Sequence, residues 1–100
     1  MPFVRIALMQ PREDQVGAVR DLQVELLRYD RTLPGFLGGY LLEPDDGTGR
    51  IGRLVLWQEK ADADNAAQQQ HTLTLRAALA RLLREDVRGH LEIATEATRI

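Results

Sequence analysis

Apolar residues follow two different spacings along the chain, and each spacing predicts a different kind of element. Three segments are apolar on both alternating sides and are bounded by Pro, Gly or Asp, which predicts strands at residues 3–9 (FVRIALM), 36–42 (FLGGYLL) and 51–58 (IGRLVLWQ). A shorter fourth strand is expected at 91–95. From 12 to 31 apolar residues recur every three or four positions, which predicts a helix with Glu13 and Asp14 in its first turn. Its expected apolar stripe is Val16, Val19, Leu22, Leu26, Tyr29 and Leu33.

A second helical region lies between the third and fourth predicted strands. Asp62 or Asp64 is expected to cap its start, within the segment DADNAAQQQ. The polar passage QQQHT predicts a break or a change of direction near His71. A more regular helix follows, with the expected buried stripe Leu75, Ala78, Leu79, Leu82 and Leu83. Between the second and third strands, EPDDGTGR predicts a hairpin loop because it is dense in Pro, Asp and Gly.

The resulting order, β-α-β-β-α-β, predicts an α+β, ferredoxin-like fold in one domain spanning residues 1–100. Right-handed crossovers would place both helices on one face of a four-stranded antiparallel sheet. The strands are apolar on both faces, so the other face would expose several hundred Å² of apolar surface. A second copy of the chain, packed sheet to sheet in a two-fold homodimer, is the simplest cover. A monomer with an exposed apolar face is the alternative.

Composition excludes several classes of function. The chain has 100 residues and a net charge of −2, which argues against a nucleic-acid partner. It lacks the run of ~20 apolar residues that a membrane span needs, and no signal peptide is recognised, so a cytoplasmic location is expected. Without Cys or Ser there is no thiolate site, disulfide or serine nucleophile. The two histidines, His71 and His90, are too few for a metal site, and none is expected.

Four features resemble the antibiotic biosynthesis monooxygenase family of the dimeric α+β barrel superfamily. They are the segment LPGFLGGYLL, the segment RLVLWQEKADA, the histidine of QQQHTLTLRAAL, and the chain length. The resemblance covers nearly the whole chain and implies a homodimeric barrel. Similar proteins include cofactor-independent oxygenases of aromatic polyketides, haem-degrading enzymes, isomerases and proteins without a known activity.

The haem-degrading relatives use an Asn on the first strand, a Trp in the second helical region and an axial His on the next helix. An alignment by eye places Ala7, Ala66 and Arg76 at these positions. All three functional residues are therefore absent, and haem degradation by that mechanism is not expected. Among the activities that the resemblance implies, one that needs no cofactor is therefore expected.

A cofactor-independent oxygenase would bind a planar aromatic or quinonoid molecule in the cleft between sheet and helices. His71 is the candidate catalytic base, because an imidazole can accept a proton near neutral pH. Trp57 is a candidate for stacking on the substrate ring, and Tyr40 is a further candidate for contacting it. Each also has a structural interpretation: His71 as an exposed residue at a helix start, and Trp57 as a core residue at a strand end.

Arg5 and Arg53 are the remaining candidates for substrate binding. By the resemblance, the side of the first strand that carries Ala7 lines the cleft, and Arg5 shares that side. An arginine in mid-strand needs an anion, a carboxylate or water. Glu92 or Glu96 on the fourth strand is one possible partner, and a carboxylate or phenolate of the ligand is another.

The predicted function is therefore that of a small homodimeric monooxygenase-like enzyme. The alternative is a non-catalytic binding or regulatory module with the same fold. If the cleft is a working site, Trp57 and His71 should border one cavity, with Arg5 or Arg53 reaching into it.

Overall fold

The computed structural model of the chain describes residues 1–86 and 89–100. Its elements are β1 (Phe3–Met9), α1 (Val16–Asp30), β2 (Phe36–Leu42), β3 (Ile51–Trp57), α2 (Lys60–Gln68), α3 (Gln70–Ala80) and β4 (Leu91–Glu96). The predicted β-α-β-β-α-β order is confirmed, with the second helical region divided into α2 and α3. The sequence segment DVRG (residues 86–89) precedes β4, and its residues 87–88 lie outside the described residues.

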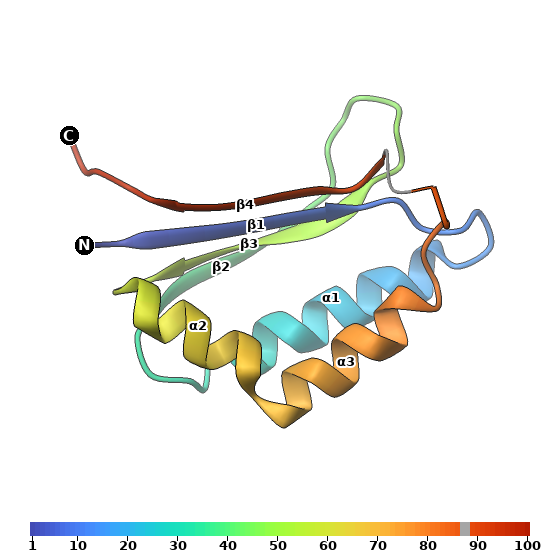
Figure 1. Ribbon diagram of the computed structural model, residues 1–100. Coiled ribbons are helices and arrows are strands. Elements are labelled where there is room, and N and C mark those ends of the chain that lie inside the picture. Colours follow the sequence, from blue (N-terminus) through green and yellow to red (C-terminus); the bar gives the residue numbers. More distant parts are fainter. Residues whose placement is uncertain (87–88) are drawn as a thin grey trace.

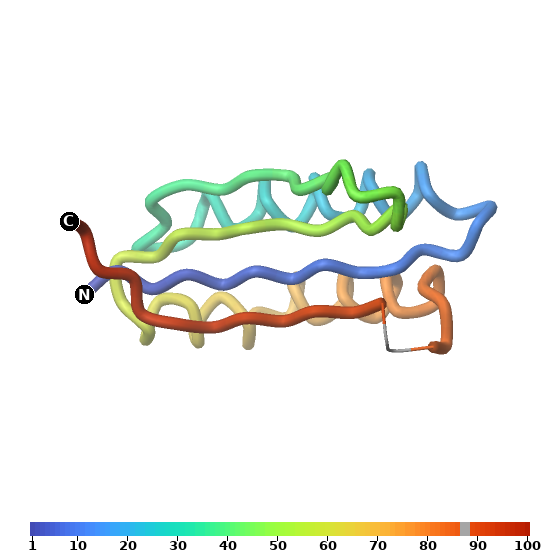
Figure 2. The backbone as a smooth tube through the Cα atoms, turned by 90° about the horizontal axis from the view of Figure 1, so that it is seen from above, coloured from blue at the N-terminus to red at the C-terminus, as the bar shows by residue number. Residues whose placement is uncertain are grey.

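The four strands form one antiparallel sheet in the order β2-β3-β1-β4. The three helices of the described residues lie on one face of this sheet, and the opposite face carries none of them (Figure 1). Seen through the sheet, α1 runs beneath β2 and β3, whereas α2 and α3 run beneath β1 and β4 (Figure 2). The helices therefore form two rows with the middle of the sheet above the space between them.

The first helix begins later than the sequence predicts. It starts at Val16, so Glu13 and Asp14 precede it and its first turn holds no acidic residue. Residues before it are held elsewhere: the backbone N–H of Arg12 donates to the carbonyl of Leu82 over 2.9 Å, and Pro11 forms a bridge with Leu83. This attachment to the chain after α3 keeps the segment from continuing the helix.

The start of α2 also differs from the prediction. Glu59, not Asp62 or Asp64, is the N-cap, and Asp62 accepts a hydrogen bond from the Glu59 backbone N–H in a capping box. The predicted break near His71 is confirmed. It falls at Gln69, whose backbone is extended, and α3 begins with the next residue.

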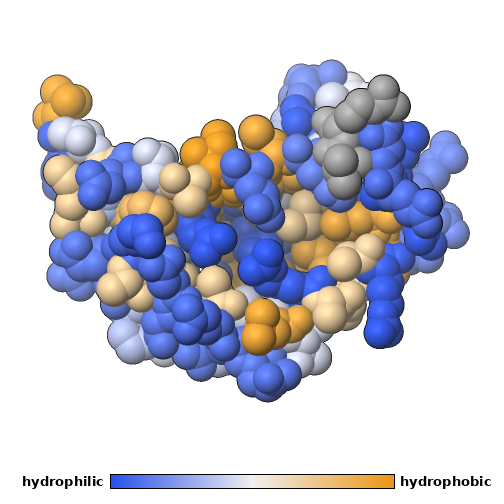
Figure 3. All heavy atoms as spheres, in the orientation of Figure 1, coloured by the Kyte–Doolittle hydropathy of each residue, from blue (hydrophilic) through white to orange (hydrophobic). Residues whose placement is uncertain are grey.

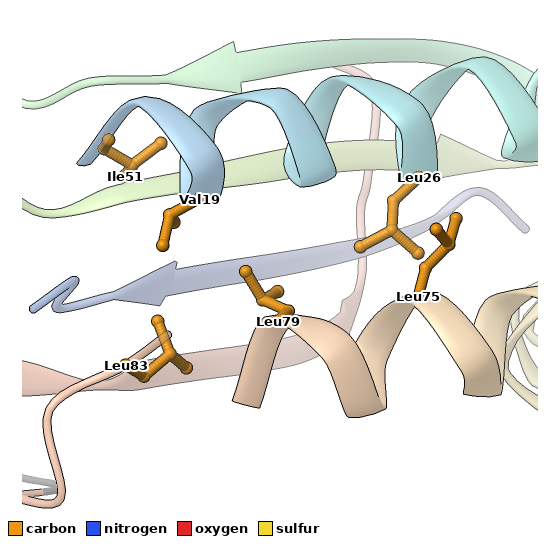
Figure 4. Close-up of a cluster of buried hydrophobic side chains, with 6 residues drawn as sticks. All are labelled: Val19, Leu26, Ile51, Leu75, Leu79 and Leu83. Carbon is orange, nitrogen blue, oxygen red and sulfur yellow. The ribbon is translucent and has the colours of Figure 1, made fainter. Parts of the chain in front are cut away.

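Two hydrophobic clusters fill the space between sheet and helices. The first contains Val19, Leu26, Ile51, Leu75, Leu79 and Leu83, from α1, β3, α3 and the turn beyond it (Figure 4). The second contains Phe3, Val55, Trp57, Ala63 and Ala66 at the opposite end of the sheet. Trp57, only 2% exposed, packs edge-on against Phe36, with 5.9 Å between the ring centroids. The core is thus divided along the strands.

Candidate functional site

A polar layer separates the two hydrophobic clusters. On the helix-facing side of β3, Arg53 lies between Ile51 of the first cluster and Val55 of the second. The strand register places Arg53 opposite Ala7 of β1, and Ala7 opposite Glu92 of β4. Neighbouring strands lie about 4.8 Å apart, so the small Ala7 leaves a gap between an arginine and a glutamate two strands apart.

A cavity of about 260 Å³ occupies this layer. The molecule is hollowed between β4 on one side and α2 and α3 on the other (Figure 3). Small side chains leave the space open, since five alanines line it: Ala7, Ala63, Ala66, Ala67 and Ala94. The larger lining residues are Arg5, Ile6, Met9, Asp30, Arg53, Val55, Trp57, Thr72, Arg76, Glu92 and Ile93.

The side chain of Arg53 is held in place by the buried side-chain amide of Gln23. Its Nη1 donates to Oε1 of Gln23 over 2.7 Å, and the Gln23 side-chain N–H donates to the sulfur of Met9 over 3.4 Å. Gln23 is fully buried. Burial lowers the pKa of Arg53, and the charge of Asp30 opposes that effect. The amide fixes the guanidinium without neutralising its charge.

Asp30 brings a buried carboxyl group to the cavity. It is the last residue of α1 and is 6% exposed. Burial raises the pKa of Asp30 from 3.8 to about 6, although the charges of Arg53 and Arg5 act in the opposite direction. A carboxyl group with such a pKa can gain or lose a proton close to neutral pH, as acid–base catalysis requires.

Three other polar side chains in the lining have no partner among residues 1–86 and 89–100. Arg5 and Arg76 form no ion pair there and donate no hydrogen bond. Thr72 is 4% exposed, and its buried hydroxyl oxygen also lacks a hydrogen-bond partner. Thr72 and Arg76 are four residues apart on α3, so they share one side of that helix.

The structure brings together three of the five predicted site residues. Arg5, Arg53 and Trp57 all line the cavity, but His71 does not. His71 is exposed at the start of α3, where its ring stands edge-on to that of Tyr29 at a centroid distance of 4.6 Å. The expectation that Trp57 and His71 border one cavity is therefore wrong. A catalytic role for His71 stays a prediction without support from this geometry.

Tyr40 lies on the other face of the sheet and is 65% exposed. Its register partner is Leu54, which pairs in turn with Ile6 on the side without helices. Tyr40 therefore does not line this cavity, and its contact with a ligand stays a prediction without support from this geometry. The reason is a register shift in β2 between Phe36 and Gly38, which moves the residues after it to the opposite face.

Sequence reasoning missed Asp30, Gln23 and Thr72: Asp30 and Thr72 line the cavity, and Gln23 accepts a hydrogen bond from Arg53. A signal for the first two is present in α1, whose buried residues are Val19, Gln23, Leu26 and Asp30. Their spacing of four, three and four places two polar residues on the buried side of the helix. The predicted stripe was slightly rotated, since Val16 is 45% exposed. A polar residue in phase with buried apolar ones is the kind of position that functional sites occupy.

The family model for antibiotic biosynthesis monooxygenases matches residues 2–78. The chain belongs to this family. The match spans β1 to most of α3 and so includes most of the residues that line the cavity. No match is found among curated proteins.

Solved structures of low sequence identity share the fold of this family member. Rv0793 from Mycobacterium tuberculosis is 23% identical with a TM-score of 0.85, and the match covers 100% of this chain and 98% of that one. The N63A mutant of SnoaB, described as a cofactor-independent oxygenase from Streptomyces nogalater, is 14% identical with a TM-score of 0.83. The match covers 99% of this chain and 95% of that one. A dimeric ferredoxin-like protein of unknown function from Jannaschia sp. is 16% identical, with a TM-score of 0.82 and coverage of 97% and 100%.

The positions that haem-degrading relatives use can now be placed in this family member. Ala7, Ala66 and Arg76 all line the cavity. Ala7 carries a methyl group where those relatives have the amide of Asn, and Ala66 carries a methyl group where they have the indole of Trp. Arg76 carries a cation where they have the imidazole that binds the haem iron. The lining therefore does not fit a haem that needs an axial ligand from α3.

Over residues 1–86 and 89–100, no three acidic or histidine side chains gather closely enough to hold a metal ion. Within the same residues, no helix has the length and apolar character to cross a membrane.

Proposed function

We propose that this chain is a small, cofactor-independent, monooxygenase-like enzyme that acts on a planar aromatic or quinonoid molecule. The observation that carries the proposal is the cavity, where Trp57, the buried carboxyl of Asp30 and the guanidinium of Arg53 meet. A ring can contact the small part of the Trp57 indole that borders the cavity while polar groups contact the ring substituents. Membership of the family supports the reaction type.

The proposed reaction requires a base, a positive group that stabilises the substrate anion, and a site that excludes water. A phenol or hydroquinone loses a proton, and the resulting electron-rich ring gives electrons to dioxygen. Asp30, when ionised, is the proton acceptor, since its pKa of about 6 leaves it ionised at neutral pH and a stronger base than an exposed carboxylate. Arg53 stabilises the negative charge that forms on the substrate oxygen.

The proposed enzyme is a homodimer joined through the sheet face without helices. Register pairing aligns Ile93, Ile6, Leu54 and Tyr40 in one row across all four strands of that face. Tyr40 and Ile93 are exposed at the two ends of this row, and an exposed apolar patch on a sheet face marks an interaction site. The Jannaschia protein, described as dimeric, shares the fold and supports a dimer.

Oxygen uptake with a panel of hydroquinones and polyphenols tests the proposal. Turnover is expected to rise with pH through about 6, because Asp30 must be ionised to accept a proton. Replacing Asp30 by Asn should lower turnover ~10²–10⁴-fold, the usual contribution of a general base, with little loss of ligand affinity. Replacing His71 by Ala is the matched comparison and should change turnover by only a few fold.

Two results would contradict this assignment in different ways. If the His71→Ala enzyme lost most of its turnover while the Asp30→Asn enzyme stayed active, the general base would be His71 and not Asp30. Ligand binding without oxygen uptake on any compound in the panel would favour the alternative, a non-catalytic binding or regulatory module.

A further inference from the structure

The cavity holds more positive than negative charge. Its lining contains three arginines, Arg5, Arg53 and Arg76, and two carboxyl groups, Asp30 and Glu92. Asp30 carries only part of a negative charge near pH 6, because burial raises its pKa to about that value. Glu92 is exposed on the edge strand and lies within 4.0 Å of no arginine nitrogen among the described residues. At least one cation in the cavity therefore lacks a counter-charge among the residues that the structure describes.

The unused hydrogen-bond donors are on opposite walls of the cavity. Arg5 belongs to the sheet and Arg76 to α3, and both are half-buried. A guanidinium carries five N–H donors in a planar fork, and neither residue uses any of them within the described protein. The unpartnered hydroxyl of Thr72 lies one helical turn before Arg76. These groups place unused donors on two sides of a cavity whose lining also includes Trp57.

Such donors identify the chemical class of the ligand. Guanidinium groups match the geometry of a carboxylate, which can accept two parallel hydrogen bonds. We infer that the ligand of this cavity is a planar aromatic acid whose carboxylate binds between Arg5 and Arg76 while its ring lies against Trp57. The inference rests on the proposed use of the cavity as a ligand site and narrows the substrate class.

Calorimetric titration with a matched pair of compounds tests the inference. The purified chain is titrated with 2-naphthoate and with 2-naphthamide, which share a ring system and differ in charge. The acid should bind at least about tenfold more tightly than the amide, since charge-assisted hydrogen bonds are the stronger ones. Added salt should weaken binding of the acid but not of the amide.

Variants locate the anion within the cavity. Arg5→Gln and Arg76→Gln should each lower affinity for 2-naphthoate by about tenfold and leave affinity for 2-naphthamide within about twofold. Both proteins should fold, because neither side chain has a partner to lose among residues 1–86 and 89–100. Arg81→Gln is the control: Arg81 is exposed just beyond α3 and outside the cavity lining, so affinity for both compounds should be unchanged.

Equal affinities for the acid and the amide would overturn the inference, as would equal losses for the two compounds in the Arg5 and Arg76 variants. These results are independent of the proposed reaction. Preference for the acid without oxygen uptake on any phenol would support the ligand class and contradict the catalytic proposal. Oxygen uptake on neutral hydroquinones, with no preference for an acid, would do the reverse.

Discussion

Single residues of this chain show where function competes with stability. Asp30 and Gln23 occupy positions on the buried side of α1 that an ordinary amphipathic helix would fill with apolar residues. Gln23 satisfies its amide through Arg53 and Met9. Asp30 has no ion pair within 4.0 Å among the described residues, and the charges of Arg53 and Arg5 offset only part of its desolvation. A polar residue retained at this cost indicates a role outside folding.

The pKa of Asp30 predicts how stability depends on pH. Its pKa is higher in the folded chain than in the unfolded one, so the folded state binds the proton more tightly. The resulting stabilisation is complete below about 3.8 and is lost as the pH rises to about 6. Asp30→Asn should therefore gain about 2–3 kcal/mol over the wild type between pH 4 and pH 7.5.

Denaturant unfolding of both proteins at the two pH values measures this difference. Asp21→Asn is the matched control, since Asp21 is an exposed residue of the same helix. An Asp30→Asn advantage that is the same at pH 4 and pH 7.5 would show that the carboxyl group is not destabilised by burial.

Residues on strands of regular register were easier to predict than the helix residue His71 or Tyr40 on the irregular strand β2. Side-chain alternation fixed the face of Arg5, Arg53 and Trp57, and all three line the cavity. His71 was misplaced because a helix residue changes its direction by about 100° with each position, so a small error in phase moves a side chain out of a site. Tyr40 was misplaced by the register shift in β2, for which the sequence FLGGYLL offers only its two glycines.

At the scale of elements, one glycine sets the closeness of β1 and β3 beside the site. Gly52 pairs with Leu8, and a Cβ atom built on it would overlap the backbone carbonyl of Ala7. Any larger residue would push apart the two strands that carry Arg5 and Arg53. The sequence could predict these strands from their apolar pattern, but it could not reveal this backbone contact, which exists only once the strands are paired.

Gly52→Ala should lower the free energy of unfolding by about 1–3 kcal/mol, the usual cost of overpacking in a close-packed region. The matched control is Gly38→Ala on β2, where an added Cβ meets no atom within 4 Å. That variant should be neutral or slightly more stable, because Ala loses less backbone freedom on folding than Gly. Equal stability of the two variants, measured by denaturant unfolding, would contradict a tight contact at Gly52.

On the scale of the whole molecule, the division of the sheet into two faces was predictable because the strands are apolar on both sides. One face carries the helices, the core and the cavity, and the other, the bare face, carries none of the described helices (Figure 1). The cavity itself was less predictable, since it arises from the meeting of small residues on β1, β4 and α2 with arginines on β1, β3 and α3. Those residues are distant in sequence and acquire a shared environment only in the fold.

Tyr40 now provides a test of assembly rather than of ligand binding. In a single chain its side chain is 65% exposed on the bare face, so Tyr40→Asp would leave a monomer folded and about as stable as the wild type. In the proposed dimer the same change places an unpaired charge in an apolar interface, which is costly. Light scattering at micromolar concentration should therefore give about twice the chain mass for the wild type and the mass of one chain for Tyr40→Asp.

Leu73→Asp is the control, because Leu73 is 46% exposed on α3, on the helical side, and this protein should stay dimeric. A wild-type chain that is monomeric and soluble at this concentration would contradict the dimer, and the bare face would then be open to a partner of another kind.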